Sequence, residues 1–182
     1  FHKKGKIIQI SKKKKLRKIV EKLLGDRARV RNIEFFLKPK KTGLASPFHQ
    51  DNYYWNIISA KALNVWVACS VVNKANGGIC YLSDSHKLGT INHKLSYSKG
   101  SSQMISSEIL SKLKFKKNFP KLNEGDCLIH HPEVIHGSFK NTSKNDRIGF
   151  VVSFASIKAK IDKIGIKKYK QSLKKNLSKL YN

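Results

Sequence analysis

Acidic residues are scarce in this chain, and so are cysteine, proline and long apolar runs. Of its 182 residues only 11 are Asp or Glu, four are Pro and three are Cys. An odd number of cysteines without a Cys-x-x-Cys pair argues against a disulfide framework or a thiolate zinc site and suits a reducing compartment, so we expect a cytoplasmic protein. No apolar run approaches the roughly 20 residues of a membrane span, which excludes an integral membrane protein.

The first residues also lack two features. The chain begins Phe1-His2-Lys3-Lys4, with neither the apolar segment of a signal peptide nor an initiator methionine. We therefore expect an N-terminally truncated fragment. The composition is 40% apolar and 27% charged, which favours one folded domain over residues 1–182 and argues against disorder.

Lysine is the predominant charged residue of the chain. Lys and Arg number 38, giving a net charge of +27, but only five of them are Arg. Nucleic-acid-binding modules rely on arginine for two-pronged contacts and interleave aromatic with basic residues. This sequence shows neither feature. We interpret the charge mainly as a solvated surface. A basic nucleic-acid-binding module stays as an alternative, which steeply salt-dependent binding would support.

The apolar pattern changes twice along the chain. Residues 12–24 repeat apolar residues at helical spacing and end at Gly25, which predicts a basic amphipathic helix. Residues 30–156 form short β-type segments between turn residues, and residues 157–182 return to helical spacing. The chain therefore predicts a mainly β (α+β) fold, a sandwich or jelly roll, flanked by basic amphipathic helices.

Within this β region the turn residues divide the chain into shorter elements. We expect strands at 30–37, 63–72, 79–83, 126–131, 134–140 and 147–156, and a short helix at 107–113. Asn76-Gly77-Gly78 predicts a tight hairpin between the second and third of these strands. Residues 84–103 are polar and predict a long loop.

Because carboxylates are few, Asp51 two residues after His49 stands out. In a strand, residues i and i+2 face the same side, so both side chains would point at one place. A second histidine would complete the two-histidine, one-carboxylate set that binds non-haem Fe(II). His136 is our candidate. His130 and His131 lie close enough in sequence to compete, although we interpret them as wall or packing residues.

Arg147 follows His136 at a spacing that suits a hairpin. If residues 141–144 form its loop, Ser138 faces Arg147 and His136 faces Gly149, so that all four point to one side. The arginine fork suits a carboxylate because it donates two parallel hydrogen bonds. No carboxylate partner is evident in this pattern, which favours a ligand as the partner. An ordinary surface arginine beside Asp146 is the alternative.

Other side chains have weaker patterns. Tyr53, Tyr54 and Trp55 follow the expected metal strand and could form a substrate wall or simply fill the core. His86 and His93 lie in the predicted loop, where we expect them to be exposed or to face the substrate.

Several motifs then follow one another along most of the chain, from about Phe36 to Phe154. They are Pro47-Phe48-His49-Gln50-Asp51, Trp66, Asn76-Gly77-Gly78, Ser85-His86, Gly125-Asp126, His136-Gly137-Ser138, Asn141, Ser143 and Arg147. In this order they resemble the phytanoyl-CoA dioxygenase family of Fe(II)- and 2-oxoglutarate-dependent oxygenases. The family commonly has Pro-Gly before Ser-His, where this chain has Ser83-Asp84, and its members are longer at the N-terminus.

The resemblance implies a double-stranded β-helix (cupin-like jelly roll) over residues 30–156, followed by a C-terminal helix over 157–182. It implies that Fe(II) is bound by His49, Asp51 and His136. It also implies that 2-oxoglutarate is held by Arg147 and Ser138, with Trp66 counted among the co-substrate residues, and that O2 is consumed.

The implied activity is hydroxylation of a C–H bond in a small organic substrate, with release of succinate and CO2. Related halogenases replace the metal-binding carboxylate by a small residue, so Asp51 favours hydroxylation. A catalytically silent jelly roll that binds a metal or ligand in the same pocket is the alternative.

Overall fold

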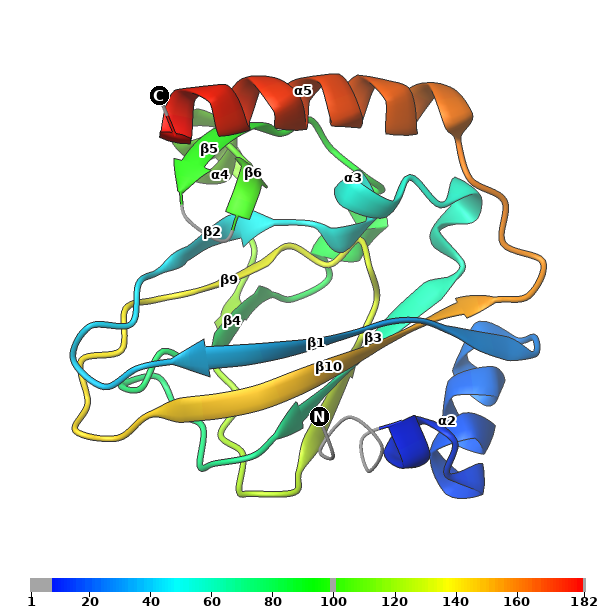
Figure 1. The fold of residues 1–182 in the computed structure, drawn as a ribbon, viewed down its shortest axis with the longest axis horizontal. Coiled ribbons are helices and arrows are strands. Elements are labelled where there is room, and N and C mark those ends of the chain that lie inside the picture. Colours follow the sequence, from blue (N-terminus) through cyan, green and yellow to red (C-terminus); the bar gives the residue numbers. More distant parts are fainter. Residues whose placement is uncertain (1–7, 99–100, 182) are drawn as a thin grey trace.

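Two antiparallel sheets face each other in the computed structural model, which describes residues 8–98 and 101–181 (Figure 1). The first sheet has the order β1 (Ala28–Lys38), β10 (Arg147–Ser156), β3 (Ala62–Ala68) and β8 (Cys127–His130). The second has the order β2 (Ser46–His49), β9 (His136–Ser138), β4 (Ile79–Leu82) and β7 (Lys117–Asn118). This is the double-stranded β-helix, or jelly roll, and the mainly β fold is confirmed.

Helices flank the two sheets. The basic helix α2 (Lys14–Leu24) packs on the outer face of the first sheet against β1, β3 and β10. The long helix α5 (Lys163–Tyr181) lies across the short helix α3 (Asp51–Trp55) and the hairpin of β5 (Lys94–Ser98) and β6 (Ser101–Met104), as Figure 1 shows. The remaining short helices are η1 (Ile58–Ala60), η2 (Ser85–Leu88) and α4 (Ser107–Lys112).

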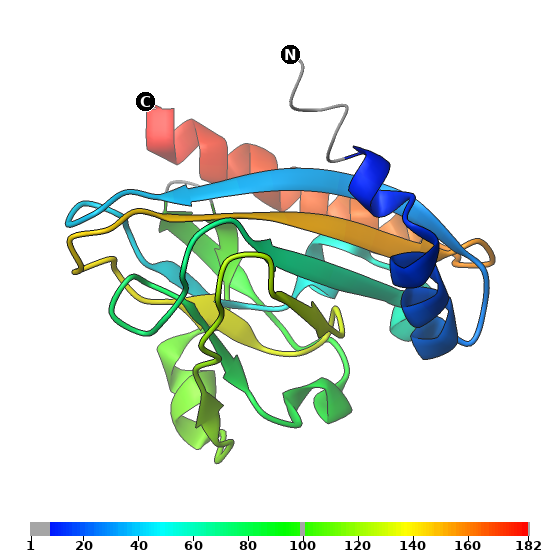
Figure 2. The ribbon, with the colours of Figure 1, turned by 90° about the horizontal axis from the view of Figure 1, so that it is seen from below.

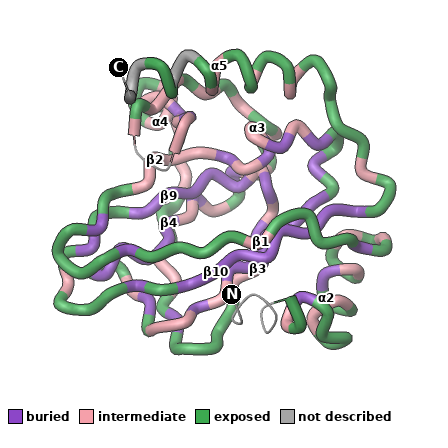
Figure 3. The backbone as a smooth tube through the Cα atoms, in the orientation of Figure 1, coloured by how far each residue is buried: buried purple, intermediate pink, exposed green. Residues whose placement is uncertain are grey.

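Strand β10 positions both the core and the site because it is buried along almost its whole length (Figure 3). Its even-numbered residues Phe150, Val152 and Phe154 pack with Val20 of α2 in one apolar cluster. Its odd-numbered residues turn toward the second sheet, and they are Arg147, Gly149, Val151 and Ser153. Because side chains alternate along a strand, one face of β10 packs in the apolar core and the other face lines the cavity.

Strands β1 to β4 alternate between the two sheets, and so do β8 to β10, which overturns two predicted hairpins. Strand β3 pairs with β10 and β8, whereas β4 pairs with β9 and β7, so the turn at 76–78 crosses between sheets instead of closing a hairpin. Figure 2 shows β1 and β10 running side by side although they lie at opposite ends of the chain. Likewise β9 pairs with β2 and β4 and not with β10, so the predicted register between His136 and Gly149 is wrong.

Other boundaries also differ from the predictions. The stretch 84–103 is not a plain loop, because it holds η2, β5 and the start of β6. The C-terminal helix begins at Lys163 and not at residue 157, since Ile161 first makes a β-bridge with Ile57. Residues 1–7, 99–100 and 182 lie outside the described part. Among the described helices, none combines the length and hydropathy that crossing a membrane would need.

The cluster under α2 predicts where stability resides. Phe154 is fully buried, so Phe154→Ala should lower the free energy of unfolding by about 3–5 kcal/mol in urea denaturation, through lost burial and the cavity left behind. Phe35 of β1 is 56% exposed and serves as the matched control. Phe35→Ala should cost about 1 kcal/mol, mostly from its ring contact with Phe150. Equal losses in the two variants would contradict this assignment of the core.

Candidate functional site

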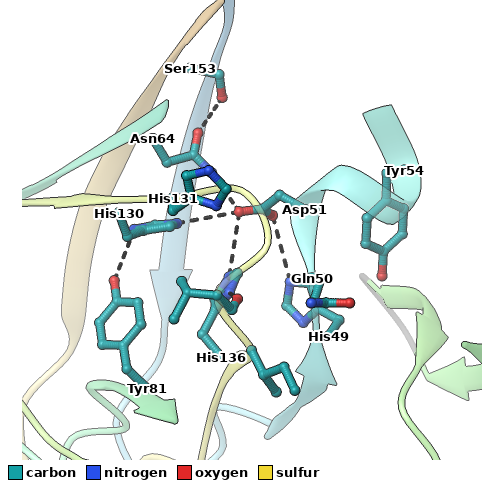
Figure 4. Close-up of polar contacts among 12 residues, drawn as sticks. His49, Gln50, Asp51, Tyr54, Asn64, Tyr81, His130, His131, His136 and Ser153 are labelled. Atoms are coloured by element: carbon teal, nitrogen blue, oxygen red, sulfur yellow. Dashed lines mark hydrogen bonds and ion pairs between the residues drawn. The ribbon is translucent and has the colours of Figure 1, made fainter. Parts of the chain in front are cut away.

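Two histidines and one carboxylate meet between the two sheets. His49 ends β2, Asp51 opens α3 and His136 opens β9. One ligand atom from each lies within 4.8 Å of the others. The Nε2 atoms of His49 and His136 are each 3.8 Å from an oxygen of Asp51 (Figure 4). Two imidazoles and one carboxylate are a donor set that fits a non-haem Fe(II), so these residues could hold a metal ion.

Both imidazoles are oriented by the backbone. Nδ1 of His49 donates to the carbonyl of Pro47 at 2.8 Å, and Nδ1 of His136 donates to that of Val134 at 3.0 Å. A carbonyl can only accept, so the proton sits on Nδ1 and the lone pair of Nε2 faces Asp51. Burial lowers the pKa of His49 to about 4 and lowers the pKa of His136 as well. Both rings are neutral at pH 7, as metal binding requires.

Asp51 is held in its ionised form. Its Oδ2 accepts a hydrogen bond from Asn64 Nδ2 at 2.7 Å and lies 3.3 Å from His130 Nε2. The amide of Asn64 is fixed in turn by Ser153, whose hydroxyl donates to Asn64 Oδ1 at 2.5 Å. Burial by itself would raise the pKa of Asp51, but His136 and His130 outweigh it, and the pKa lies below its ordinary value. The carboxylate is therefore available as a ligand.

The strand geometry predicted for His49 and Asp51 is wrong, although the two side chains do converge. The strand ends at His49 and a helix begins at Asp51, so a sharp change of direction brings the side chains together. Gln50 points away and is fully buried. Its Nε2 donates to the carbonyls of Gly89 and Glu133 at 2.8 and 2.6 Å, and its Oε1 accepts from the Ile91 N–H at 2.8 Å. Gln50 thus ties two loops to the backbone between the two candidate ligands.

Sequence reasoning missed two histidines that support this arrangement. His130 is more than a packing residue, because its ring joins the hydroxyl of Tyr81 at 3.0 Å to Asp51 (Figure 4). His93, expected to be exposed or to face the substrate, is half-buried. Its Nε2 accepts from the Gln50 N–H at 2.9 Å, and burial lowers its pKa to about 4. No local pattern marks His93, since it acts on a residue 43 positions away.

A cavity of about 120 Å³ connects the candidate ligands to Arg147. Ser138, Trp66 and Asn64 line it as well. The guanidinium of Arg147 is buried, its Nε has no hydrogen-bond partner, and no ion pair found among the described residues includes it. Burial lowers the pKa of Arg147 to about 10, so the group stays positive at neutral pH. A buried cation with a free donor fits an anionic ligand.

Trp66 forms the wall beside this arginine. The guanidinium carbon of Arg147 lies 5.4 Å from the centre of the Trp66 ring. Gly149 makes room for the ring, because a Cβ at that position would overlap it. His136, Ser138 and Arg147 line one cavity together with Trp66, while Gly149 lies against the Trp66 ring, and β9 and β10 belong to different sheets and are not a hairpin.

The three aromatic residues after Asp51 separate from one another because they lie on a helix. Trp55 lines the cavity. Tyr53 stacks on His93 with ring centres 4.1 Å apart. Tyr54 packs edge-on against His49 and donates its hydroxyl to the carbonyl of Gln103 at 3.0 Å. Of the three, only Trp55 is among the residues lining the cavity, so the expected wall of all three does not form.

Fold and site together define a jelly-roll protein with a candidate non-haem metal centre and a cavity lined by a buried arginine. The model of the phytanoyl-CoA dioxygenase family (PhyH) matches residues 2–149, and the chain belongs to this family. The resemblance carried by the motifs is thus confirmed. No curated protein matches the chain.

Solved structures share the fold at low sequence identity. An apo non-heme monooxygenase, ThoJ, has a TM-score of 0.67 and 19% identity, covering 91% of this chain and 71% of its own. The epimerase SnoN, in complex with Fe3+, α-ketoglutarate and nogalamycin RO, has a TM-score of 0.68 and 20% identity, with 84% and 59% covered. EctD from S. alaskensis, with 2-oxoglutarate and 5-hydroxyectoine, has a TM-score of 0.68 and 19% identity, with 81% and 51% covered. The chain thus spans between about half and seven tenths of these proteins.

The geometry predicts the effect of removing one candidate ligand. His136→Ala should weaken Co2+ binding, measured by anaerobic calorimetric titration, by more than about 100-fold, because loss of an orienting partner alone costs 10–100-fold. The fold should persist, as judged by circular dichroism. His86 is the control, because it lies in η2 and its ring contacts His131 instead of the candidate ligands. Wild-type affinity in His136→Ala would show that the ion binds elsewhere.

Proposed function

We propose that the protein is a Fe(II)- and 2-oxoglutarate-dependent dioxygenase that hydroxylates a C–H bond of a small organic molecule. One observation carries this proposal: a two-histidine, one-carboxylate set lines the same cavity as a buried arginine that has no acidic partner among the described residues. The two histidines and the carboxylate would bind a metal, and the arginine would bind a carboxylate. A dicarboxylate that chelates a metal at one end needs both. The complexes of SnoN and EctD, which hold α-ketoglutarate (2-oxoglutarate), support it.

The residues present fit both groups. His49 and His136 would bind Fe(II) through Nε2, and Asp51 would bind through a carboxylate oxygen, which leaves further positions open for co-substrate and oxygen. Bound together with 2-oxoglutarate and O2, the ion supplies the oxidation, in which one oxygen atom enters succinate as CO2 leaves and the other enters the substrate. Asp51 favours hydroxylation because it keeps a carboxylate where related halogenases have a small residue.

The protein itself would position the co-substrate and exclude water from the cavity. Arg147 would receive the far carboxylate of 2-oxoglutarate through its fork, with the Ser138 hydroxyl beside it. Trp66 would form a flat wall along the co-substrate, and Trp55 lines the same cavity. The carbonyl-anchored imidazoles keep their Nε2 atoms aimed at the metal position, so little reorganisation is needed when the metal binds.

We also propose that the protein works in the cytoplasm. Its three cysteines are all free, and Cys127 is exposed, which suits a reducing compartment. Such a compartment also keeps iron in the ferrous state.

The deciding experiment measures succinate release by the protein with Fe(II), 2-oxoglutarate and O2 against a library of small metabolites. We expect succinate to form with the true substrate, together with a product heavier by one oxygen atom, and His136→Ala to form neither. Anaerobic Fe(II) titration offers a substrate-free control, because 2-oxoglutarate bound to the metal should produce its own absorption band. The absence of both band and succinate would favour a catalytically silent binding protein.

A second prediction concerns the arginine. Arg147→Lys keeps the positive charge but loses the two-pronged geometry, so 2-oxoglutarate binding should weaken by about 1.5–3 kcal/mol, seen as a raised KM. Metal affinity should stay unchanged, because Arg147 is not among the candidate ligands. Arg29 is exposed, and Arg29→Lys is the matched control. An unaltered KM in Arg147→Lys would remove the main reason to place the co-substrate here.

A further inference from the structure

Lys38, at the end of β1, is a buried lysine that the proposed reaction does not use. It is only 5% exposed, whereas lysine side chains are almost always solvated. Its Nζ donates to Ser138 Oγ at 2.6 Å and to the carbonyl of Phe139 at 2.7 Å. Ser138 is one of the residues that line the cavity, so the ammonium lies directly behind the cavity wall.

The protein holds this ammonium in place. A Cβ at Gly43 would overlap the Lys38 side chain, and a Cβ at Gly77 would lie 2.5 Å from Lys38 Cδ, so both glycines are needed for the stem to fit. Asn141 Nδ2 donates to the Lys38 carbonyl at 2.9 Å and fixes its backbone. The stem of Lys38 is thus packed against two glycines, and its ammonium makes two hydrogen bonds.

Two buried cations therefore lie near each other without an acid. Burial and the charge of Arg147 lower the pKa of Lys38 to about 8. Neither cation takes part in the ion pairs formed among residues 8–98 and 101–181. Placing two desolvated like charges together costs free energy, and a bound anion would offset that cost.

Lys38 also decides what Ser138 can do. A hydroxyl has one proton and two lone pairs, and the ammonium takes a lone pair of Ser138 Oγ. The Ser138 proton is then directed away from Lys38. Within the described structure this hydroxyl donates to no protein group, so it is free to donate to an anion in the cavity.

We propose that Lys38 is a positioning residue for the anion that Arg147 receives, acting through the Ser138 hydroxyl and through its own positive charge. The cavity thereby selects a chain that ends in a carboxylate over one that ends in a neutral group. This inference rests on the proposed function, in which that carboxylate belongs to 2-oxoglutarate.

The test measures binding instead of turnover. Protein loaded with Mn2+ is titrated calorimetrically, without O2, with 2-oxoglutarate and with 2-oxopentanoate, which keeps the keto-acid head and replaces the far carboxylate by a methyl group. Lys38→Met, similar in length and uncharged, should weaken 2-oxoglutarate binding about 10–100-fold and leave 2-oxopentanoate binding unchanged. Lys40→Met, an exposed lysine two residues further on, should change neither.

A double-mutant cycle shows whether Lys38 acts through Ser138. Ser138→Ala should weaken 2-oxoglutarate binding in the wild-type background but much less in the Lys38→Met background, because the two residues form one hydrogen-bonded unit. Independent, additive losses would overturn the part of the proposal that runs through the hydroxyl.

The pH dependence provides a readout that packing alone would not move. An anion raises the pKa of Lys38 when it binds, so wild-type affinity for 2-oxoglutarate should be constant below pH 8 and fall as the pH rises through about 8. The other charged group that acts on Lys38 is Arg147, which keeps its charge to about pH 10. Lys38→Met should show a flat profile up to pH 9.

The outcomes separate this role from the function on which it rests. If the wild type binds no 2-oxoglutarate, both proposals are overturned. If the wild type binds it and Lys38→Met binds it equally well, the role of Lys38 alone is overturned. If Lys38→Met loses affinity for both keto acids together with melting temperature, Lys38 is a packing residue and the proposal is likewise overturned.

Discussion

The buried carboxylate of Asp51 is the group on which the rest of the site depends. It accepts hydrogen bonds from Asn64 of β3 and His130 of β8, which keep it ionised, and it faces the Nε2 atoms of His49 from β2 and His136 from β9, so elements of both sheets surround it. Removing a carboxylate from water is costly unless hydrogen bonds and nearby positive charge replace the solvent. The jelly roll supplies these partners because its two sheets present side chains to a common interior. A metal ion bound among the same side chains would complete the neutralisation.

Positive charge is also held in fixed positions at this cavity. Arg147 comes from β10 of the first sheet, while Ser138 comes from β9 of the second, and Lys38 reaches Ser138 from β1. Both cations are buried, and glycines make room around each of them. Gly149 leaves space for Trp66 beside Arg147, and Gly43 and Gly77 leave space for the Lys38 side chain. A candidate metal-binding set with an ionised carboxylate and a cationic pocket lie in one small space, which would suit a short molecule that binds metal at one end and is anionic at the other.

Stability and chemistry are separated on the two faces of β10. Toward α2 the strand presents Phe150, Val152 and Phe154, which build an apolar cluster with no polar function. Toward the second sheet it presents Arg147, Gly149 and Ser153, which serve the cavity and the Asp51 network. Because alternate side chains of a strand point to opposite faces, one ten-residue strand contributes both to the apolar core and to the cavity.

The sequence by itself determined the motif order and the family, because the motifs are short segments, and the resemblance to the family identified His49, Asp51 and His136 as residues that converge. It also predicted the mainly β fold and placed the strand at 147–156 as the structure has it. Which strands pair was decided only by the tertiary structure. Local periodicity shows that a segment is a strand but not its partner, and here β3 and β4, like β9 and β10, belong to opposite sheets, so both predicted hairpins failed. Gln50, His93 and Lys38 were missed for the same reason, since their partners lie 39 to 101 residues away and no local pattern encodes a contact over such a distance.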